Sequence, residues 1–168
     1  MKKLVVLLAC ALITSSAALA QSQKFGWLTS ADLLQSMPEK AKADSDLAKY
    51  ARSFQDQIDI MMKEYQTKGQ QYQTTEKTMT DAMKEVKMKE IQDLQNRIES
   101  TQQSAQEKLQ QKKQDVYAPI LDKADKAIQA VAKEKNYDYI FDKSGGMLLF
   151  AKEADDIMPF VKAKLGIK

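Results

Sequence analysis

Histidine is absent from the 168 residues of this chain, which contains only 1 cysteine, 3 prolines and 5 glycines. Without histidine the chain lacks the commonest general base, the Ser-His and Cys-His nucleophile pairs and every His-based metal site. No run approaches the roughly 18 apolar residues of a membrane-spanning helix. The hydrophobic fraction of 43% is nevertheless too high for a wholly disordered chain, and the length suits one domain. Composition alone therefore argues against most enzyme classes.

The N-terminal residues 1–20 have the pattern of a secretory signal peptide. Two lysines at 2–3 precede an apolar run over residues 4–13, and Ala18-Leu19-Ala20 is the small-x-small pattern that signal peptidase recognises. Lipidation at Cys10 would leave an apolar core of about six residues, below the usual ~7–15, so we favour cleavage after Ala20. Cleavage would lower the formal net charge from +3 to +1 and remove the only cysteine. We therefore expect a periplasmic protein without disulfides.

The middle of the chain, residues 38–135, predicts a long helical hairpin with its tip near residues 73–81. Apolar residues recur every seven positions in the first half and every eleven in the second, as in helices that pack along a seam. Between the halves, residues 70–80 break this pattern and hold four threonines, which favour helix ends. The predicted seam consists of Leu47, Phe54, Ile58, Met61, Tyr65, Tyr72, Leu94, Ile98, Leu109 and Val116.

Residues 21–37 and 136–168 predict a small β-containing association body with a C-terminal helix. Tyr137–Asp142 and Met147–Ala151 flank a Gly-Gly turn, which favours a β-hairpin, and Phe25–Leu28 would add a third strand. Asp155 or Asp156 would cap the last helix. A sheet of so few strands is only marginally stable by itself, and we therefore expect the body to self-associate. Candidate contacts for this association, or for the body core, are Phe25, Trp27, Leu28, Tyr139, Phe141, Leu148 and Phe150.

Several apolar residues of the hairpin fall outside the seam and are candidates for binding a partner. Ile60 and Met62 lie to either side of the seam, and Met88 lies off the stripe of the second helix. Methionine suits a surface that adapts to many shapes. Met79 and Met83, near the tip, are expected either to contact a partner or to pack against the turn and stabilise it. The aromatic seam residues could also grip a partner, but their heptad spacing favours packing between the helices.

The order of these segments resembles the Skp/OmpH family of periplasmic chaperones. The residues that carry the resemblance are Lys24–Leu28 leading into Ala31–Gln35, and Ala127–Ala132 followed by the Tyr137–Asp142 strand. The resemblance covers essentially the whole mature chain. It implies a homotrimer whose three bodies join while three helical hairpins surround a cavity. It also implies that unfolded outer-membrane β-barrel proteins are held in that cavity without ATP.

The charge of the hairpin departs from the strongly basic arms of the best-known family members. Residues 39–85 carry 8 basic and 9 acidic side chains, and residues 86–135 carry 10 and 8. Near-neutral arms argue against binding to lipid or lipopolysaccharide, and we expect no nucleic-acid partner. Asp155 and Asp156 alone would make a poor metal site. We therefore predict no metal, no cofactor and no catalytic residue.

Two functional hypotheses follow for this α+β chain. The first is an ATP-independent periplasmic holdase for unfolded outer-membrane proteins. The second is a structural or adaptor coiled-coil protein of the envelope that binds one folded partner. A specific interface should present a persistent apolar patch with an anchor residue, whereas a holdase should present scattered soft residues. The scattered positions of Ile60, Met62 and Met88 favour the holdase.

Overall fold

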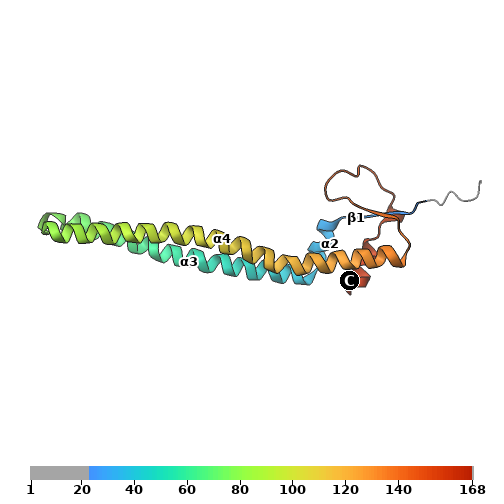
Figure 1. Cartoon of the computed structure of the whole chain (residues 1–168), viewed down its shortest axis with the longest axis horizontal. Helices are drawn as coiled ribbons and strands as arrows, with labels where there is room; N and C mark the ends of the chain where they lie inside the picture. The colour runs from blue at the N-terminus through green and yellow to red at the C-terminus, as the bar shows by residue number, and fades with distance from the viewer. Residues whose placement is uncertain (1–22, 168) are drawn as a thin grey trace, which may run out of the picture. The chain divides into compact units, whose positions relative to one another are not determined.

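The computed structural model describes residues 23–167, so the predicted signal peptide lies outside the described residues. The elements follow one another as β1 (Phe25–Leu28), α2 (Ser30–Ser36), α3 (Pro38–Thr75), η2 (Glu76–Thr78), α4 (Asp81–Glu134), β2 (Tyr139–Asp142), η3 (Glu153–Asp155) and α5 (Met158–Leu165) (Figure 1). They divide into two compact units. We call residues 31–126 the arm, and residues 23–30 with 127–166 the body. The prediction of a long helical hairpin with a small β-containing region is confirmed.

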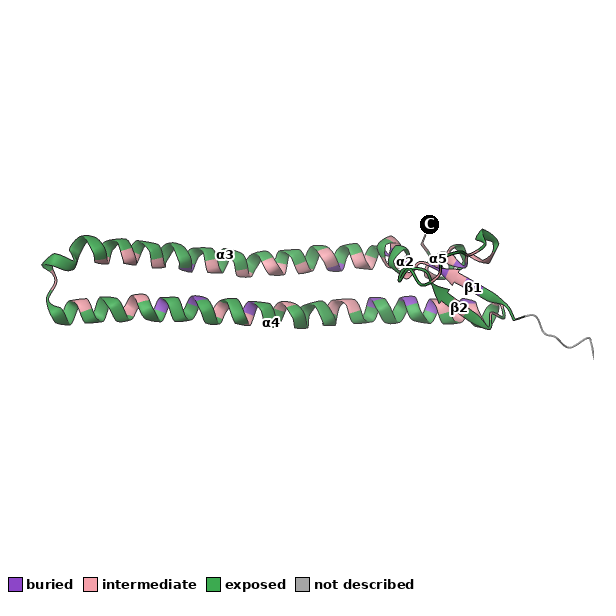
Figure 2. Ribbon diagram, turned by 90° about the horizontal axis from the view of Figure 1, so that it is seen from above, coloured by how far each residue is buried: buried purple, intermediate pink, exposed green. Residues whose placement is uncertain are grey.

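The arm is an antiparallel pair of helices, α3 and α4, which lie side by side in both views (Figures 1 and 2). Their connection spans residues 76–80, where the Thr80 side chain accepts a hydrogen bond from the Met83 N–H at 3.3 Å. Threonine caps a helix well because its hydroxyl replaces a missing backbone acceptor at the first turn. The threonine-rich stretch thus supplies both the end of α3 and the start of α4.

Apolar burial in the arm is concentrated at a few places along the two helices. Met61, Leu94 and Ile98 form a buried cluster, with Ile58 and Tyr65 packed against it. Nearer the other end of the arm, smaller residues such as Ala43, Ala105 and Ala124 are buried, together with Ile120. Since a fully buried large apolar side chain contributes about 1.5–3 kcal/mol, the three side chains of the cluster at Met61 stabilise the hairpin more than the buried alanines do.

The sheet of the body consists of two parallel strands, with Phe25 opposite Tyr139 and Leu28 opposite Asp142. Parallel strands need a long crossover connection, and here residues 29–138 provide it. On the other edge of β1, the Ile157 N–H donates to the Trp27 carbonyl at 2.9 Å. β1 is therefore the central strand of the body.

The predicted β-hairpin around the Gly-Gly turn is wrong. The turn exists, since Gly146 has φ +70° and its N–H donates to the Lys143 carbonyl at 3.3 Å. However, Met147–Ala151 forms no strand. The physical reason is that the chain after β2 continues to the opposite edge of β1, where Asp156 and Ile157 pair with Trp27, so Met147–Ala151 does not return along β2. The segment Met147–Ala151 is a loop without regular secondary structure.

A glycine is required at the centre of β1. A Cβ atom on Gly26 would lie 2.8 Å from the Ile157 side chain and 3.0 Å from the Tyr137 ring. Ile157 is fully buried, as are Leu28 and Val161, and Val131 is 98% buried. Because the core side chains approach the backbone of β1 so closely, only a residue without a side chain fits there.

The last helix, α5, follows a turn at Asp156 and ends at a left-handed glycine. The Asp156 carboxylate accepts a hydrogen bond from the Met158 N–H at 2.8 Å, and Gly166 ends the helix in the left-handed conformation with φ 71°. A carboxylate at a helix start and a glycine at its end each satisfy backbone groups that the helix leaves open. Val161, on the inner face of α5, is thereby held in the core of the body.

Candidate functional site

Exposed apolar residues are scattered along the arm. Of the side chains proposed from the sequence to bind a partner, Ile60 is 70% exposed, Met88 58%, Met83 52% and Met62 38%, whereas Met79 is half-buried. The structure adds Val86, which is 57% exposed and which the sequence reasoning missed. Its position three residues after Met83 was the available signal, since residues at that spacing share a helix face. The arm therefore offers single or paired apolar side chains rather than one continuous patch.

The predicted seam residues occupy two different environments. Met61, Leu94 and Ile98 are buried together. The others are half-buried: Leu47, Phe54, Ile58, Tyr65, Tyr72, Leu109 and Val116. Between residues 44 and 60 of α3, and between 106 and 119 of α4, no residue is fully buried. The middle of the hairpin is consequently packed less tightly than the cluster near Met61.

A groove lies between α3 and α4 close to the connection at residues 76–80. Its volume is about 230 Å³. Two lysines and one glutamate meet at its rim. Lys68 Nζ is 3.3 Å and Lys87 Nζ is 3.0 Å from the same oxygen of Glu90. The hydrogen bonds from Lys87 and then from Lys68 hold the pKa of the Glu90 carboxyl below its usual range. The Glu90 carboxylate thus pairs with two ammonium groups.

A second polar contact region surrounds Pro119, which lies inside α4. On one side of it Tyr117 donates a hydrogen bond to the Asp44 carboxylate, and on the other Lys123 pairs with Glu39. Hydrogen bonds from Lys40 and then Tyr117 lower the pKa of Asp44, and the bond from Lys123 lowers the pKa of Glu39. Because Pro119 cannot donate to the carbonyl four residues earlier, these contacts join α3 and α4 where α4 lacks one backbone hydrogen bond.

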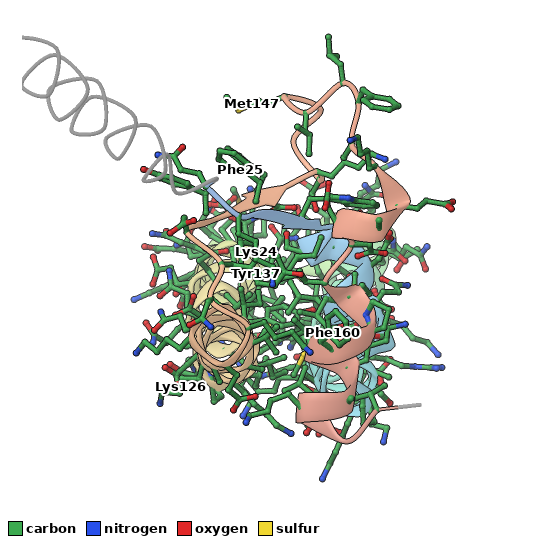
Figure 3. The ribbon with its side chains drawn as sticks, turned by 90° about the vertical axis from the view of Figure 1, so that its right-hand side faces the viewer. Lys24, Phe25, Lys126, Tyr137, Met147 and Phe160 are labelled. Carbon is green, nitrogen blue, oxygen red and sulfur yellow. The ribbon has the colours of Figure 1, made fainter. Side chains whose placement is uncertain are left out.

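The body exposes a cluster of large apolar side chains. Phe25 packs against Tyr139 and Phe141 with ring centroids 5.7 and 6.0 Å apart, yet all three rings remain partly exposed. On the loop after β2, Met147 is 92% and Leu149 94% exposed, and Figure 3 shows Met147 at the outer part of this loop. The sequence reasoning placed both in the predicted strand Met147–Ala151 but named only Leu148 and Phe150 as candidate contacts.

The predicted body residues are divided between the core and the surface. Leu28 is buried, Trp27 and Leu148 are half-buried, and Phe150 is 79% exposed. Phe25, Phe141, Leu148 and Phe150 line a shallow groove of about 260 Å³ beside Trp27. Since a soluble monomer rarely exposes so many large apolar side chains together, this surface is a candidate for burial against another chain.

The loop that carries the exposed side chains is attached to the body at both of its ends. The Trp27 indole N–H donates to the Lys152 carbonyl at 2.8 Å, and Lys143 Nζ lies 4.6 Å from the centre of the Trp27 ring. Burial raises the pKa of Asp142, but hydrogen bonds from Ser30 and Ser144 outweigh it and hold that pKa well below its usual range. The contacts of Trp27 and Asp142 thereby hold the two ends of the loop that carries residues 147–150.

The described part of the chain, residues 23–167, contains no cluster of three or more His, Cys, Asp or Glu side chains placed to hold a metal ion. Within the same range no helix has the length and apolar content needed to cross a membrane. Asp155 ends η3, and Asp156 lies between η3 and α5, where its carboxylate accepts a hydrogen bond from the Met158 N–H.

The fold therefore belongs to a class of α+β proteins with a long helical hairpin and a small parallel sheet. The model of the OmpH-like outer membrane protein family matches residues 24–165, so the chain belongs to that family. The resemblance found in the sequence is confirmed. No curated protein matches the chain.

The fold is similar to that of a solved structure from Caulobacter crescentus, described provisionally as an outer membrane chaperone (OmpH-like). The TM-score is 0.76 at 15% sequence identity, and the match covers 86% of this chain and 84% of that chain. At such low identity the similarity establishes the fold, and the function has to be argued from the surfaces described above.

Proposed function

We propose that the protein is an ATP-independent periplasmic chaperone that binds unfolded outer-membrane β-barrel proteins and prevents their aggregation. The observation that carries this proposal is the set of isolated, exposed apolar side chains on the arm, led by Ile60, Met83 and Met88. Family membership and the description of the Caulobacter protein support the same function. We assign no catalytic step, metal or cofactor to the protein.

The mechanism would be many weak contacts rather than one strong site. Unfolded β-barrel proteins expose strand edges that pair with one another and aggregate. Exposed methionine and isoleucine side chains can contact varied apolar segments without a fixed geometry. If several arms surround one client, each contact acts at high effective concentration and the total affinity exceeds that of any single contact. Release would then require only a more stable destination, such as folding into the membrane.

Self-association as a homotrimer is part of this proposal. The exposed apolar cluster of the body, with Met147, Leu149 and Phe150, supports burial against another copy. Within residues 23–167 the sheet has only the strands β1 and β2, so the outer edge of β2 keeps unpaired backbone groups. An apolar surface beside an open strand edge is the pattern expected of an association surface.

The proposed location is the periplasm, reached through a signal peptide cleaved after Ala20. The near-neutral arms give little attraction for anionic lipid or for nucleic acid, so neither is proposed as a partner. Unfolded outer-membrane proteins and further copies of this chain remain as the proposed partners.

The experiment uses the full chain, expressed with its own N-terminal segment and purified from the periplasm of the host. A urea-unfolded outer-membrane β-barrel protein is diluted into it without nucleotide, and turbidity is followed, with a soluble cytosolic protein as the control client. We expect suppression of turbidity near one oligomer per β-barrel client. Unchanged aggregation, with the protein folded and oligomeric, would contradict the chaperone function.

A triple variant tests which residues bind the client. Ile60→Ser, Met62→Ser and Met88→Ser together should weaken protection and leave oligomerisation unchanged, because these side chains lie outside the buried cluster of the arm. Three exposed glutamines changed to serine, Gln57, Gln66 and Gln110, form the matched control. Loss of assembly in the triple variant, measured by light scattering with gel filtration, would reassign these residues to packing.

The alternative is an envelope adaptor that binds one folded partner. The clustered apolar surface of the body favours this reading more than the arm does, because a specific interface concentrates its energy in a central patch. The β-barrel client separates the two functions: an adaptor would leave it to aggregate, as it would the control client, whereas a chaperone would protect it.

A further inference from the structure

The groove near the connection of α3 and α4 combines an apolar floor with a cationic rim. Tyr72, Met79 and Ile91 are half-buried and supply the apolar part. Lys68, Lys87 and Glu90 supply the charged part. Figure 2 shows this end of the hairpin, where α3 and α4 are joined. In this groove, half-buried apolar side chains and a group of charges lie next to each other.

The charges of the groove do not cancel. Both lysines share the carboxylate of Glu90, so the lining residues carry one more positive than negative charge. Glu64 lies 3.9 Å from Lys68, at the limit of an ion pair, and does not line the groove. An incoming carboxylate could accept hydrogen bonds from the ammonium groups that Glu90 leaves unsatisfied, because each ammonium has three donors.

The size of the groove limits what it can hold. Its volume of about 230 Å³ is below the roughly 300–1,000 Å³ of sites that enclose a whole small molecule. The floor residues are only half-buried, so the groove is open to solvent along the arm. One large side chain of a longer chain therefore fits it better than a free ligand does.

We propose that this groove binds an aromatic or large aliphatic side chain that lies next to a carboxylate in an unfolded polypeptide. The inference rests on the proposed chaperone function, which supplies unfolded polypeptide as the partner, and it adds a sequence preference to that function. The apolar side chain would lie against Tyr72, Met79 and Ile91, while the carboxylate would accept hydrogen bonds from Lys68 and Lys87.

The test measures the binding of short fluorescent peptides to the full chain by anisotropy. Four peptides share the same Gly/Ser/Thr flanks and differ in a central pair: Phe-Asp, Phe-Asn, Phe-Lys and Ser-Asp. We expect the Phe-Asp peptide to bind about two- to fivefold more tightly than Phe-Asn, the effect of one exposed charge contact. Phe-Lys should bind most weakly of the three Phe peptides. The preference for Phe-Asp should decrease with added salt, because exposed charges are screened.

Two pairs of variants locate the binding. Lys68→Gln with Lys87→Gln should remove the preference of Phe-Asp over Phe-Asn, whereas Lys63→Gln with Lys89→Gln, at exposed positions outside the groove, should keep it. Both pairs remove the same charge from the same two helices. Met79→Ser should weaken all Phe peptides together, whereas Leu109→Ser, at a half-buried seam position outside the groove, should not.

The outcomes separate this inference from the proposed function. Equal binding of Phe-Asp and Phe-Asn, or equal effects of the two lysine pairs, would overturn the inference even if the protein suppresses aggregation. A preference that follows Lys68 and Lys87 would support it. Failure to protect the β-barrel client, together with retained peptide preference, would overturn the chaperone function and leave a peptide-binding groove.

Discussion

The arm and the body both expose apolar side chains, but they distribute them differently. In the arm, Ile60, Met83 and Met88 are separated from one another by polar residues of long helices. In the body, Met147, Leu149 and Phe150 follow one another within a single loop beside the exposed rings of the sheet. A scattered set suits transient contacts with many partners, whereas a clustered set suits one lasting contact.

The two units also differ in what holds them together. The arm has an apolar cluster around Met61 and polar contacts around Pro119. The body joins segments from both ends of the described chain through β1, whose two edges are occupied by β2 and by Ile157. We therefore expect the arm to respond to change locally and the body to respond as a whole.

The largest effect should come from charging the clustered surface of the body. Met147→Asp with Leu149→Asp would place two carboxylates where we propose that copies associate, and an uncompensated buried charge costs about 3–5 kcal/mol. We expect loss of the oligomer in light scattering, with helix content by circular dichroism unchanged. Asp substitutions at the exposed arm residues Gln57 and Gln110 serve as the control. An intact oligomer in the loop variant would show that this cluster has another use.

The next effect concerns the apolar cluster of the arm. Leu94→Ala removes a side chain that is 97% buried with Met61 and Ile98. We expect a loss of about 2 kcal/mol, at the low end for buried leucine, because the half-buried surroundings can collapse onto the space. Hydrogen exchange should accelerate in α3 and α4 around the cluster and stay unchanged in β1. Equal acceleration in both units would mean that the arm and the body unfold together.

Local patterns in the sequence predicted the arm better than the body. The seven- and eleven-residue spacings lie within single helices, and the threonines that end α3 and start α4 lie next to each other in the chain. The parallel pairing of Phe25–Leu28 with Tyr139–Asp142 joins segments more than 110 residues apart, and no local pattern encodes it. The same limit explains why a local Gly-Gly turn suggested a hairpin that the structure lacks.

The candidate surfaces were predicted only in part for a related reason. Helical spacing placed Ile60, Met62 and Met88 off the seam, and all three are exposed. The contact of Tyr117 with Asp44 could not be predicted, because the register between the two helices depends on how the whole hairpin packs. The exposure of Met147 and Leu149 follows from the absence of a strand there, which local preference for β-structure did not reveal.

A smaller effect is expected for Asp142, which connects the end of β2 to the start of α2. Its carboxylate accepts hydrogen bonds from the Ser30 N–H at 3.0 Å and from the Ser144 N–H at 2.9 Å. Asp142→Asn should cost about 1 kcal/mol, as for the loss of a helix cap. Urea unfolding followed by the fluorescence of Trp27, the only tryptophan, measures it in the body.

The pH dependence of this variant has a definite sign. The folded pKa of Asp142 lies below its ordinary value of 3.8, so its contribution is present above pH 3.8 and is lost as pH falls through the folded value. The unfolding free energies of parent and variant should therefore differ at neutral pH and converge in acid. Glu153→Gln, at an exposed position of the body, should show no such convergence. A difference that is constant with pH would assign Asp142 a purely steric role.

The smallest effect is expected at the polar contacts around Pro119, because exposed ion pairs contribute little to stability. Glu39→Gln with Asp44→Asn removes the carboxylates that receive Lys123 and Tyr117. The global unfolding midpoint should hardly move, while hydrogen exchange in residues 106–124 should accelerate, since no residue between 106 and 119 is fully buried. Added salt should accelerate exchange in the parent and have little further effect in the variant. Asp56→Asn with Glu85→Gln, at exposed positions elsewhere on the arm, is the control. The exchange rates in this stretch could be the same in the parent, the test variant and the control. The half-buried residues alone would then stabilise the stretch, and the arm and the body would differ only in how their apolar side chains are arranged.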